Sequence, residues 1–418
     1  MNHSLWGVGS VSDALDPPHK SDNDNRFIQL AWRRQHSPDE TYSLQYTRSN
    51  KDYENAWVIP GAASGLPWDV PVDLNYTVQR EQLEFQANLV LDAHSRAAYG
   101  AEMRRDEIQS HTFFAPGGSL SEEMYRLFGT WEWRPHAAWL ANLGGMLEHH
   151  YLAGSTFSPR FSLHYLPSGR HAFRLGLSRG YRSETFFEQV PNYGVSYAGV
   201  LIDQIKIPSP NLKPEMIDSR ELGYVGSYPE LRLNLNLRLF NDHLQRLIEA
   251  VKQPFPAELS AGKRASQDQN IVDIDMWGAE YQVQWQPEAA SRIVFNQAWI
   301  WQKARDHLIP GSNDENEMET SAPRLSYSLL AMRDFGQGVS ASIGYHKVGQ
   351  MSWLGEGDPI PAYRRFDLRL AKAWRTGQGR YELALTLQNL FRDQQDFEEE
   401  IDHQISANRA FVSLRFWD

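Results

Sequence analysis

The stretch Leu231 to Phe240 reads LRLNLNLRLF, with leucine at every second position and Arg or Asn between the leucines. A period of two is typical of a β-strand with one apolar and one polar face. In a water-soluble sandwich the apolar face would cover a protein core. In a closed membrane barrel it would contact lipid, and the polar face would line the interior. The rest of the chain decides between these two orientations.

The composition excludes several classes of protein. The 418 residues carry a formal net charge of -11, which argues against nucleic acid as a partner, because phosphate binding needs clustered Lys and Arg. Cysteine is absent, so the chain has neither disulfides nor thiolate metal ligands. Mean hydropathy is -0.55. No stretch approaches the roughly 20 apolar residues that a membrane-spanning helix needs.

Segments with a period of two recur from one end of the chain to the other. In Trp277–Trp285 the odd positions hold Trp, Ala, Tyr, Val and Trp, and the even positions hold Gly, Glu and Gln. In Tyr381–Leu387, Tyr and Leu alternate with Glu, Ala and Thr. About 16 to 18 such strands are expected, and no amphipathic helix longer than about three turns. The sequence therefore predicts an all-β protein.

The connectors between these strands are alternately very short and long. The short ones carry turn-forming residues, and they lie at 36–40, 92–96, 134–137, 166–170, 227–230, 286–290, 334–338 and 376–379. The long ones cover 50–73, 107–120, 183–215, 244–269, 305–320 and 392–404, with a shorter one near 151–157. Successive connectors of an up-and-down antiparallel sheet lie at opposite ends. This rhythm therefore places short turns at one end and long loops at the other, as in outer-membrane barrels.

Other all-β architectures fit the chain less well. A β-propeller would show a repeat of about 40 residues, and a sandwich of this many strands would divide into domains joined by linkers. The chain has neither feature, and its polar faces carry Glu, Gln, Arg or Asn on strand after strand, which suits a hydrated or plugged interior. The predicted fold is an antiparallel transmembrane β-barrel whose leucines face lipid.

Tryptophan gathers near the ends of the predicted strands. Membrane barrels carry aromatic girdles at both membrane interfaces. Here Trp131, Trp133, Trp285 and Trp374 lie beside short turns, and Trp299 and Trp301 lie near a long loop. The last strand, RAFVSLRFWD, places Val412, Leu414 and Phe416 on one face, as expected for a lipid-facing strand.

Four stretches resemble the TonB-dependent outer-membrane receptors, a family that imports iron chelates, cobalamin and other scarce nutrients. SPNLKPEMIDSRELGY at 209–224 resembles the Asn-Pro-Asn-Leu-Lys-Pro-Glu and Glu-Leu-Gly pattern that leads into a barrel strand. SRGYRSETFFEQ at 178–189 is similar to the Arg-Ala-Pro-Ser-Leu-x-Glu stretch, with Glu184 where proline is usual. FSPRFSLHY at 157–165 and QNLFRD at 388–393 are similar to two further family landmarks.

The resemblance implies a barrel of about 22 strands, filled by an N-terminal plug and preceded by a segment that recruits TonB. On that comparison, residues 1–418 form a receptor-like β-barrel domain from which the plug and the first strands are missing. The first residues, MNHSLWGVGS, also lack the charged and apolar regions of a secretory signal. The expected location is the bacterial outer membrane, with outer-membrane lipid and lipopolysaccharide around the barrel.

Candidate ligand-binding residues come from the longest loop and from the polar faces. The loop at 183–215 holds Phe186, Phe187, Tyr193 and Tyr197. Such an aromatic rim could stack on a flat chelate, and ordinary packing within the loop explains these residues equally well. Four arginines lie on predicted inward faces, where they would bond an anionic ligand or a plug, or pair with carboxylates such as Asp367. These are Arg232, Arg238, Arg365 and Arg369.

Three further groups of polar residues are expected to bind no ligand. His149 and His150 are neighbours on a strand and point to opposite faces, so they cannot share one metal ion, and we expect surface histidines. The acidic loop RDHLIPGSNDENEMETSAP at 305–323 does not match an EF-hand and is expected to be solvated. The same interpretation applies to DFEEEID at 396–402.

The function is expected to be transport. No nucleophile, base and orienting residue come together, and no glycine-rich phosphate loop is present, so neither an enzymatic activity nor a cofactor is expected. The resemblance implies active, TonB-dependent uptake of a scarce nutrient, with an iron–siderophore complex as the first candidate and the TonB complex as partner. Three alternatives stay open: a passive porin-like channel, a non-functional receptor fragment and a soluble all-β binding module.

Overall fold

The computed structural model describes residues 2–8, 16–65, 67–114, 118–197, 200–255, 264–311, 313–352, 359–377, 379–391 and 408–417. In this part of the chain, 21 strands form one sheet. Three of them, β4 (Val70–Asp73), β11 (Tyr193–Tyr197) and β12 (Val200–Lys206), lie in connectors, which leaves eighteen in the wall. Two further strands, β19 (Met351–Ser352) and β20 (Pro359–Ile360), pair only with each other.

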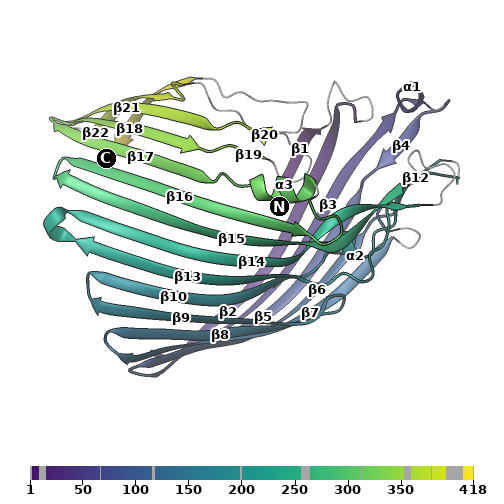
Figure 1. Cartoon of the computed structure of the whole chain (residues 1–418), viewed down its shortest axis with the longest axis horizontal. Helices are drawn as coiled ribbons and strands as arrows, with labels where there is room; N and C mark the ends of the chain where they lie inside the picture. The colour runs from purple at the N-terminus through teal and green to yellow at the C-terminus, as the bar shows by residue number, and fades with distance from the viewer. Residues whose placement is uncertain are drawn as a thin grey trace.

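The wall strands follow one another in chain order, each antiparallel to the next. They are β1 (Asn2–Val8), β2 (His19–Ser37), β3 (Glu40–Ile59), β5 (Tyr76–Asp92), β6 (Ser95–Gln109), β7 (Ser119–His136), β8 (Trp139–His150), β9 (Gly154–Ser168), β10 (His171–Arg182), β13 (Glu215–Tyr228), β14 (Leu233–Pro254), β15 (Arg264–Glu288), β16 (Ser291–Asp306), β17 (Leu325–Gly336), β18 (Val339–Val348), β21 (Tyr363–Thr376), β22 (Gly379–Gln388) and β23 (Arg409–Trp417). Figure 1 shows the wall curving round, so that β2 to β7 lie behind β13 to β17. The predicted antiparallel barrel wall and its strand number are confirmed.

The two ends of the wall differ as the spacing of the connectors predicts. Tight turns such as those at 169–170, 289–290 and 337–338 lie at the left of Figure 1, and the long connectors lie at the right. The long end also carries the helices, α1 (Gly61–Ser64), α2 (Phe186–Gln189) and α3 (Asn313–Thr320). No helix in the described ranges is long and apolar enough to cross a membrane.

Two of the expected connectors need correction. The predicted loop at 244–269 is mostly strand, because β14 continues to Pro254 and β15 begins at Arg264. Polar residues and a small apolar cluster that includes Leu247 and Val272 continue the pairing there, and the register shifts at 244–248. The connector at 349–362, between β18 and β21, was not predicted at all. The alternation of apolar and polar residues predicts the membrane-crossing part of a strand. It does not predict how far the strand extends beyond the membrane.

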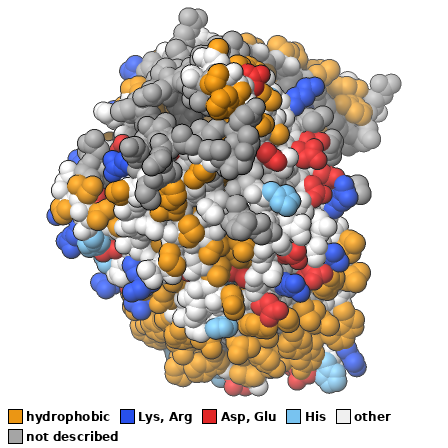
Figure 2. Space-filling view, turned by 90° about the vertical axis from the view of Figure 1, so that its right-hand side faces the viewer, with side chains coloured by type: hydrophobic (Ala, Val, Ile, Leu, Met, Phe, Trp, Pro, Cys, Tyr) orange, Lys and Arg blue, Asp and Glu red, His pale blue; other side chains and the backbone are white. Residues whose placement is uncertain are grey.

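The outward face of the wall is apolar. Leu127, Leu222 and Leu414 are 60%, 56% and 67% exposed. A water-soluble protein does not expose so many large apolar side chains together. Figure 2, which looks onto the long-loop end, shows apolar side chains over the lower outer surface and charged ones interspersed above them. The expected girdle residues Trp131, Trp133, Trp285, Trp301 and Trp374 are exposed as well.

The decisive stretch at 231–240 begins its strand two residues later than predicted. Residues Pro229–Leu231 form a 3-10 turn, η1, and Arg232 has a φ of 51°, in the left-handed region. This conformation reverses the chain between β13 and β14, so the strand starts at Leu233. From there Leu233, Leu235, Leu237 and Leu239 occupy one face, as the alternation predicts.

Candidate functional site

An aromatic cluster lies at the long-loop end, and Phe113 is its centre. The Phe113 ring meets Phe187 at 5.1 Å and Tyr193 at 5.2 Å between ring centroids, both edge to face. Tyr76 lies 6.5 Å from Phe113 and 5.0 Å from Tyr53. The cluster therefore joins two wall strands, the connector at 110–118 and the connector at 183–214.

Two lysines flank this cluster. Lys206 Nζ lies 4.4 Å from the centroid of the Phe187 ring and 2.6 Å from Asp268 Oδ2, in an ion pair that is largely buried. Lys51 Nζ lies 5.1 Å from the Tyr76 ring centroid and donates a hydrogen bond of 2.8 Å to the Tyr76 hydroxyl. A lysine over an aromatic face gains a cation–π attraction. The rim thus combines aromatic rings with two ammonium groups, of which that of Lys206 is neutralised by Asp268.

The two loop connectors are also joined through their backbones. Asn192 N donates to Phe113 O at 2.8 Å, and Phe114 and Asn192 form an isolated bridge. The connector at 183–214 begins with α2, whose Thr185 and Glu188 form a reciprocal capping box. The Arg182 guanidinium bonds Glu188 and also Glu215, where the connector ends. The described part of the longest loop is therefore tied both to the wall and to the neighbouring connector.

The predicted rim residues are only partly brought together. Phe187 and Tyr193 share the Phe113 contact, and burial raises the pKa of the Tyr193 hydroxyl. Phe186 lies on α2 and is half-buried. Tyr197 ends β11, and its side chain lies outside the described residues. Sequence reasoning missed Phe113 and Lys206, because only the fold brings their separate connectors together.

A second group near the rim corrects the prediction for His150. His149 bonds Ser155 Oγ at 2.9 Å, whereas His150 is 4% exposed and its Nε2 lies 3.3 Å from Glu122 Oε1. The two histidines do face opposite ways, but His150 is buried in the inner wall. Glu184, in the connector after β10, is 2% exposed and accepts a hydrogen bond from Gln189. Burial raises the pKa of the Glu184 carboxyl, and His150 opposes that rise.

The acidic loop after β16 is also more ordered than predicted. Asp306 is 1% exposed, and its Oδ1 accepts hydrogen bonds from the backbone of Leu308 and Ile309. Glu315 accepts from the backbone of Asp306 and of Gly311, and so ties α3 to β16. These two carboxylates accept hydrogen bonds from backbone N–H groups of the loop, and so they are not simply solvated as predicted. The segment 396–402 lies outside the described residues.

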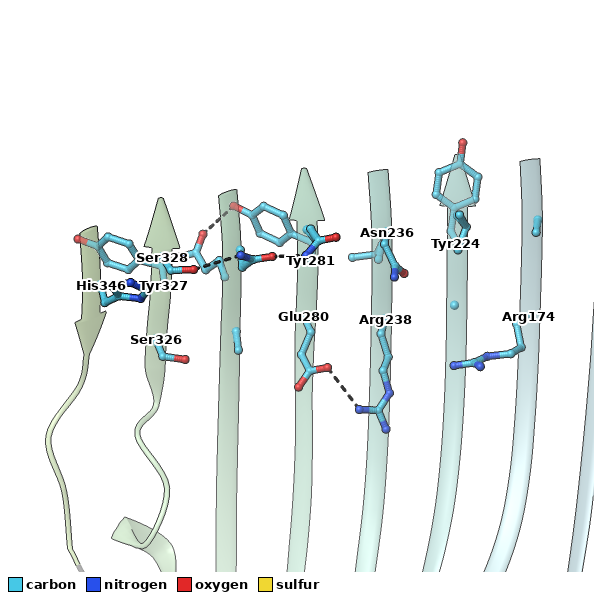
Figure 3. Close-up of a pocket in the computed structure, with 18 of the residues that line it drawn as sticks. Arg174, Tyr224, Asn236, Arg238, Glu280, Tyr281, Ser326, Tyr327, Ser328 and His346 are labelled. Carbon is cyan, nitrogen blue, oxygen red and sulfur yellow. Dashed lines mark hydrogen bonds and ion pairs between the residues drawn. The ribbon is translucent and has the colours of Figure 1, made fainter. Parts of the chain in front are cut away.

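The inner wall carries a ladder of charged side chains that crosses four strands. Arg174 pairs with Glu221, Glu221 Oε2 lies 2.7 Å from Arg238 Nε, and Arg238 Nη1 lies 3.3 Å from Glu280 Oε2. Figure 3 shows Arg174, Arg238 and Glu280 on one face of neighbouring strands. Opposite charges across neighbouring strands stabilise the sheet and keep its inner face wet. Arg238 therefore faces inward, as predicted.

Amides and hydroxyls continue the polar wall beyond this ladder. Gln282 Nε2 lies 2.6 Å from Asn296 Oδ1, and Asn296 Nδ2 lies 3.1 Å from Ser328 Oγ. Together with Arg238, Glu280 and other residues, they line a cavity of about 710 Å³ to which eight strands contribute (Figure 3). The lining of this cavity can form hydrogen bonds to water or to a polar partner, and the charged residues Arg238 and Glu280 lie on one side of it.

The other inward arginines divide into two kinds. Arg365 bonds Asp367 at 3.0 Å, and Arg369 bonds Glu382 at 2.6 Å, which confirms their pairing with carboxylates of the wall. Arg232 instead lies in the turn before β14, at the end opposite the rim, where it lines a cavity of about 470 Å³ with Asn234, Gln284 and Arg292. In the described ranges no group of three or more His, Asp and Glu could hold a metal ion.

Comparison with solved structures supports the fold. The ferric enterobactin receptor PfeA of Pseudomonas aeruginosa superposes with a TM-score of 0.67 at 13% identity, covering 98% of this chain and 71% of that one. The siderophore receptor PirA of Acinetobacter baumannii gives 0.72 at 12%, covering 99% and 67%. The ferric-catecholate import receptor Fiu of Escherichia coli gives 0.66 at 11%, covering 95% and 65%. Comparison with curated proteins gives no match.

The comparison with protein families covers most of the chain. Residues 3–390 match the family described as TonB dependent receptor-like, beta-barrel. The strand order, the apolar outward face and the polar inner wall agree with that match, and the bacterial outer membrane is the location that the family implies. The chain therefore belongs to the family of TonB-dependent receptor β-barrels, which are transport receptors.

Proposed function

We propose that the chain forms the barrel of an outer-membrane receptor for the TonB-dependent uptake of an iron–siderophore complex. The observation that carries the proposal is the rim cluster, in which Phe113, Phe187 and Tyr193 meet beside Lys206. Aromatic faces stack on flat chelates, and lysine attracts an anionic one. Structures with the same fold include the PfeA receptor in complex with enterobactin, which is consistent with a ligand of this chemistry.

In this proposal the ligand moves from the rim to the inner wall. Phe186, Phe187, Tyr193 and Tyr197 belong to the loop that first contacts the ligand. Arg238 lies in the charged ladder, where its guanidinium can exchange a wall carboxylate for an anionic ligand or a plug. Arg232, at the opposite end, lies where the ligand would leave the barrel.

The proposal also states which domain the chain forms and which protein complex supplies the energy for uptake. Residues 1–418 form one barrel domain in an outer membrane of lipid and lipopolysaccharide. The plug on which the TonB complex acts comes, in this proposal, from sequence outside these residues. TonB-driven rearrangement of that plug would release the ligand through the barrel.

Binding of ferric enterobactin tests the proposal directly. The chain is folded in detergent, and quenching of its intrinsic tryptophan fluorescence is followed as the chelate is added. We expect saturable binding, weakened about tenfold by Phe187→Ala, which removes a contact of roughly 1.4 kcal/mol. Phe335→Ala is the matched control, because Phe335 is 61% exposed at the short-turn end. Absence of saturable binding, or equal weakening by both variants, contradicts the proposed site.

A passive channel is the second candidate function. The observation that favours it is the hydrated inner wall, where Gln282, Asn296 and Ser328 bond one another beside a cavity of about 710 Å³. Planar bilayers test the channel: a stable, reproducible open pore formed by the 418-residue chain supports it, whereas a membrane that stays closed contradicts it. Purification in high yield as a monomer without detergent would contradict both.

A further inference from the structure

A cavity of about 460 Å³ lies at the long-loop end, where β14 and β15 extend beyond the wall. It is lined by residues 209–213, from the connector between β12 and β13, by residues 267–271 of β15, and by Arg246 of β14. Sites for small molecules usually measure about 300–1,000 Å³. The cavity is therefore large enough to hold a small ligand of its own.

The side chain of Asn270 holds two basic residues of this cavity together. Its Nδ2 donates hydrogen bonds to the carbonyl oxygens of Lys213, at 2.9 Å, and of Arg246, at 2.6 Å. Its Oδ1 accepts a hydrogen bond of 2.8 Å from Lys213 N. One amide thus fixes the backbones of two basic residues that belong to different segments of the chain.

The backbone of Arg246 has an unusual conformation. Its φ is 60°, in the left-handed region that residues with a Cβ rarely adopt, and the register of β14 with β15 shifts around it. Asp273 Oδ1 accepts a hydrogen bond of 2.8 Å from Arg246 N, while Asn270 bonds the Arg246 carbonyl. Such conformations persist where the surroundings impose them, and an irregularity of this kind re-aims a side chain.

The basic side chains of the cavity have no acidic partner in the described part of the chain. Neither Lys213 nor Arg246 forms an ion pair or a side-chain hydrogen bond with another described residue. Arg246 Nε is buried without an acceptor, and so is the hydroxyl of Ser209, which is 3% exposed. The one carboxylate that lines the cavity, Asp268, pairs with Lys206 at 2.6 Å. Because a buried donor without an acceptor costs free energy, this arrangement favours an anion in the cavity.

We propose that the cavity binds the phosphate group of a small soluble molecule through Arg246 and Lys213. The guanidinium offers a planar fork for two phosphate oxygens, the ammonium adds a point charge, and the Ser209 hydroxyl adds a neutral donor. Inorganic phosphate and a phosphate ester share this chemistry. The inference goes beyond the proposed function, because none of Phe113, Phe187 and Tyr193 lines the cavity.

Isothermal titration calorimetry of the chain folded in detergent, at constant ionic strength, tests the site. The probes are inorganic phosphate and glucose 6-phosphate, with glucose as the uncharged control. We expect saturable binding of a phosphate probe and no binding of glucose, and the tighter of the two probes shows whether the phosphate is free or esterified. Arg246→Gln and Lys213→Gln should each weaken binding about tenfold, through loss of a charge-assisted hydrogen bond. Lys252→Gln is the matched control, because Lys252 is exposed on β14 outside the cavity, and it should leave the affinity unchanged.

Two further readouts separate a built site from general attraction of anions. Arg246→Lys keeps the charge but not the fork, so its affinity should lie between those of the unchanged chain and Arg246→Gln. In the unchanged chain, the bound phosphate should slow hydrogen exchange of the amides at 211–213 and 267–271. This measurement needs no variant, so it decides the question even if a substitution prevents folding.

Three results would overturn the proposal: no saturable binding of either phosphate probe, equal binding of glucose, and equal weakening by Lys252→Gln. Ferric enterobactin separates this site from the proposed function. Arg246→Gln should leave its binding unchanged, whereas Phe187→Ala should weaken it. If Arg246→Gln weakened binding of the chelate and no phosphate probe bound, Arg246 would belong to the siderophore site and the inference would be wrong.

Discussion

The outward and inward faces of the wall are made by the same strands but are stabilised in different ways. Outward leucines such as Leu222 and Leu239 are 56% and 44% exposed, so their burial depends on surrounding hydrocarbon. Inward side chains bond one another across strands, as Arg238 does with Glu221 and Glu280. Successive residues of one strand thus face lipid and water in turn. The effect of a substitution on the free energy of unfolding should therefore differ between neighbouring residues.

The largest expected difference compares Leu237 with its neighbour Asn236, which lie on opposite faces of β14. Leu237→Arg should lower the free energy of unfolding by about 2–4 kcal/mol, the cost of a basic side chain near the middle of the bilayer. Asn236→Arg should change it by less than about 1 kcal/mol, because the inner face is wet. Urea unfolding of the barrel in lipid vesicles measures both. Equal costs would contradict the assignment of the two faces.

A second comparison stays on the inner face and concerns packing. A Cβ added at Gly278 would lie 2.5 Å from the Phe240 ring and 2.5 Å from the carbonyl oxygen of Trp299. Gly278→Ala should therefore lower the free energy of unfolding by about 1–3 kcal/mol through overpacking. The control is Gly176→Ala, whose added Cβ would meet nothing nearer than Glu221 Cβ at 3.7 Å. A similar loss in both variants would show that the Phe240 contact does not matter.

The third prediction concerns a carboxyl of the loop connector that is buried at the inner face. Burial raises the pKa of Glu184 above the usual value of about 4.3. The charged form is disfavoured in the docked loop, so docking is lost progressively as pH rises from the usual value through the raised one. Glu184→Gln should remove this loss and stabilise the loop by about 1 kcal/mol at pH 8, with no gain below about pH 4.

Hydrogen exchange of the amides at 186–189 measures this effect, after correction for the intrinsic pH dependence of exchange. Glu188→Gln serves as the comparison, because Glu188 lies on the same connector but bonds Arg182 and caps α2. That variant should weaken the loop at neutral pH instead. An unchanged pH profile in Glu184→Gln would rule out the carboxyl as its source.

The smallest expected effect comes from the charged ladder. Arg238→Ala should lower the free energy of unfolding by about 0.5 kcal/mol, because Arg238 and Glu280 are each more than a third exposed and Glu221 keeps its Arg174 partner. The loss should shrink in high salt. Urea unfolding at low and high ionic strength checks both points. If Arg238→Ala lowered the free energy of unfolding more than Leu237→Arg does, the inward face would be the more sensitive one, and the proposed difference between the two faces would be wrong.

Much of the wall could be predicted from the sequence, because it depends on local patterns. Alternation in stretches such as Trp277–Trp285 fixes a strand and its faces, and turn residues fix the short end. The family resemblance rested on similar local stretches, including 209–224. The start of β14 was misplaced because Leu231 continues the alternation, although Arg232 adopts a left-handed turn conformation.

The rim could not be predicted in the same way, because it depends on contacts between distant segments. Nothing near Phe113 in the sequence shows that it packs between Phe187 and Tyr193. His150 resembles a surface histidine until the fold places Glu122 beside it. Only the residue types of the longest loop, Phe and Tyr, indicated a binding surface, and that part of the prediction remains to be tested by ligand binding.

The double contact of Arg182 determines how the longest loop can vary. One guanidinium holds Glu188 at 2.9 Å and Glu215 at 2.5 Å, at the two places where the connector leaves and rejoins the wall. Changes in length or composition between these anchors need not be transmitted to the register of β10 and β13. Evolution can therefore remodel that segment, and with it the ligand choice that we propose for it, while the membrane-spanning architecture stays the same.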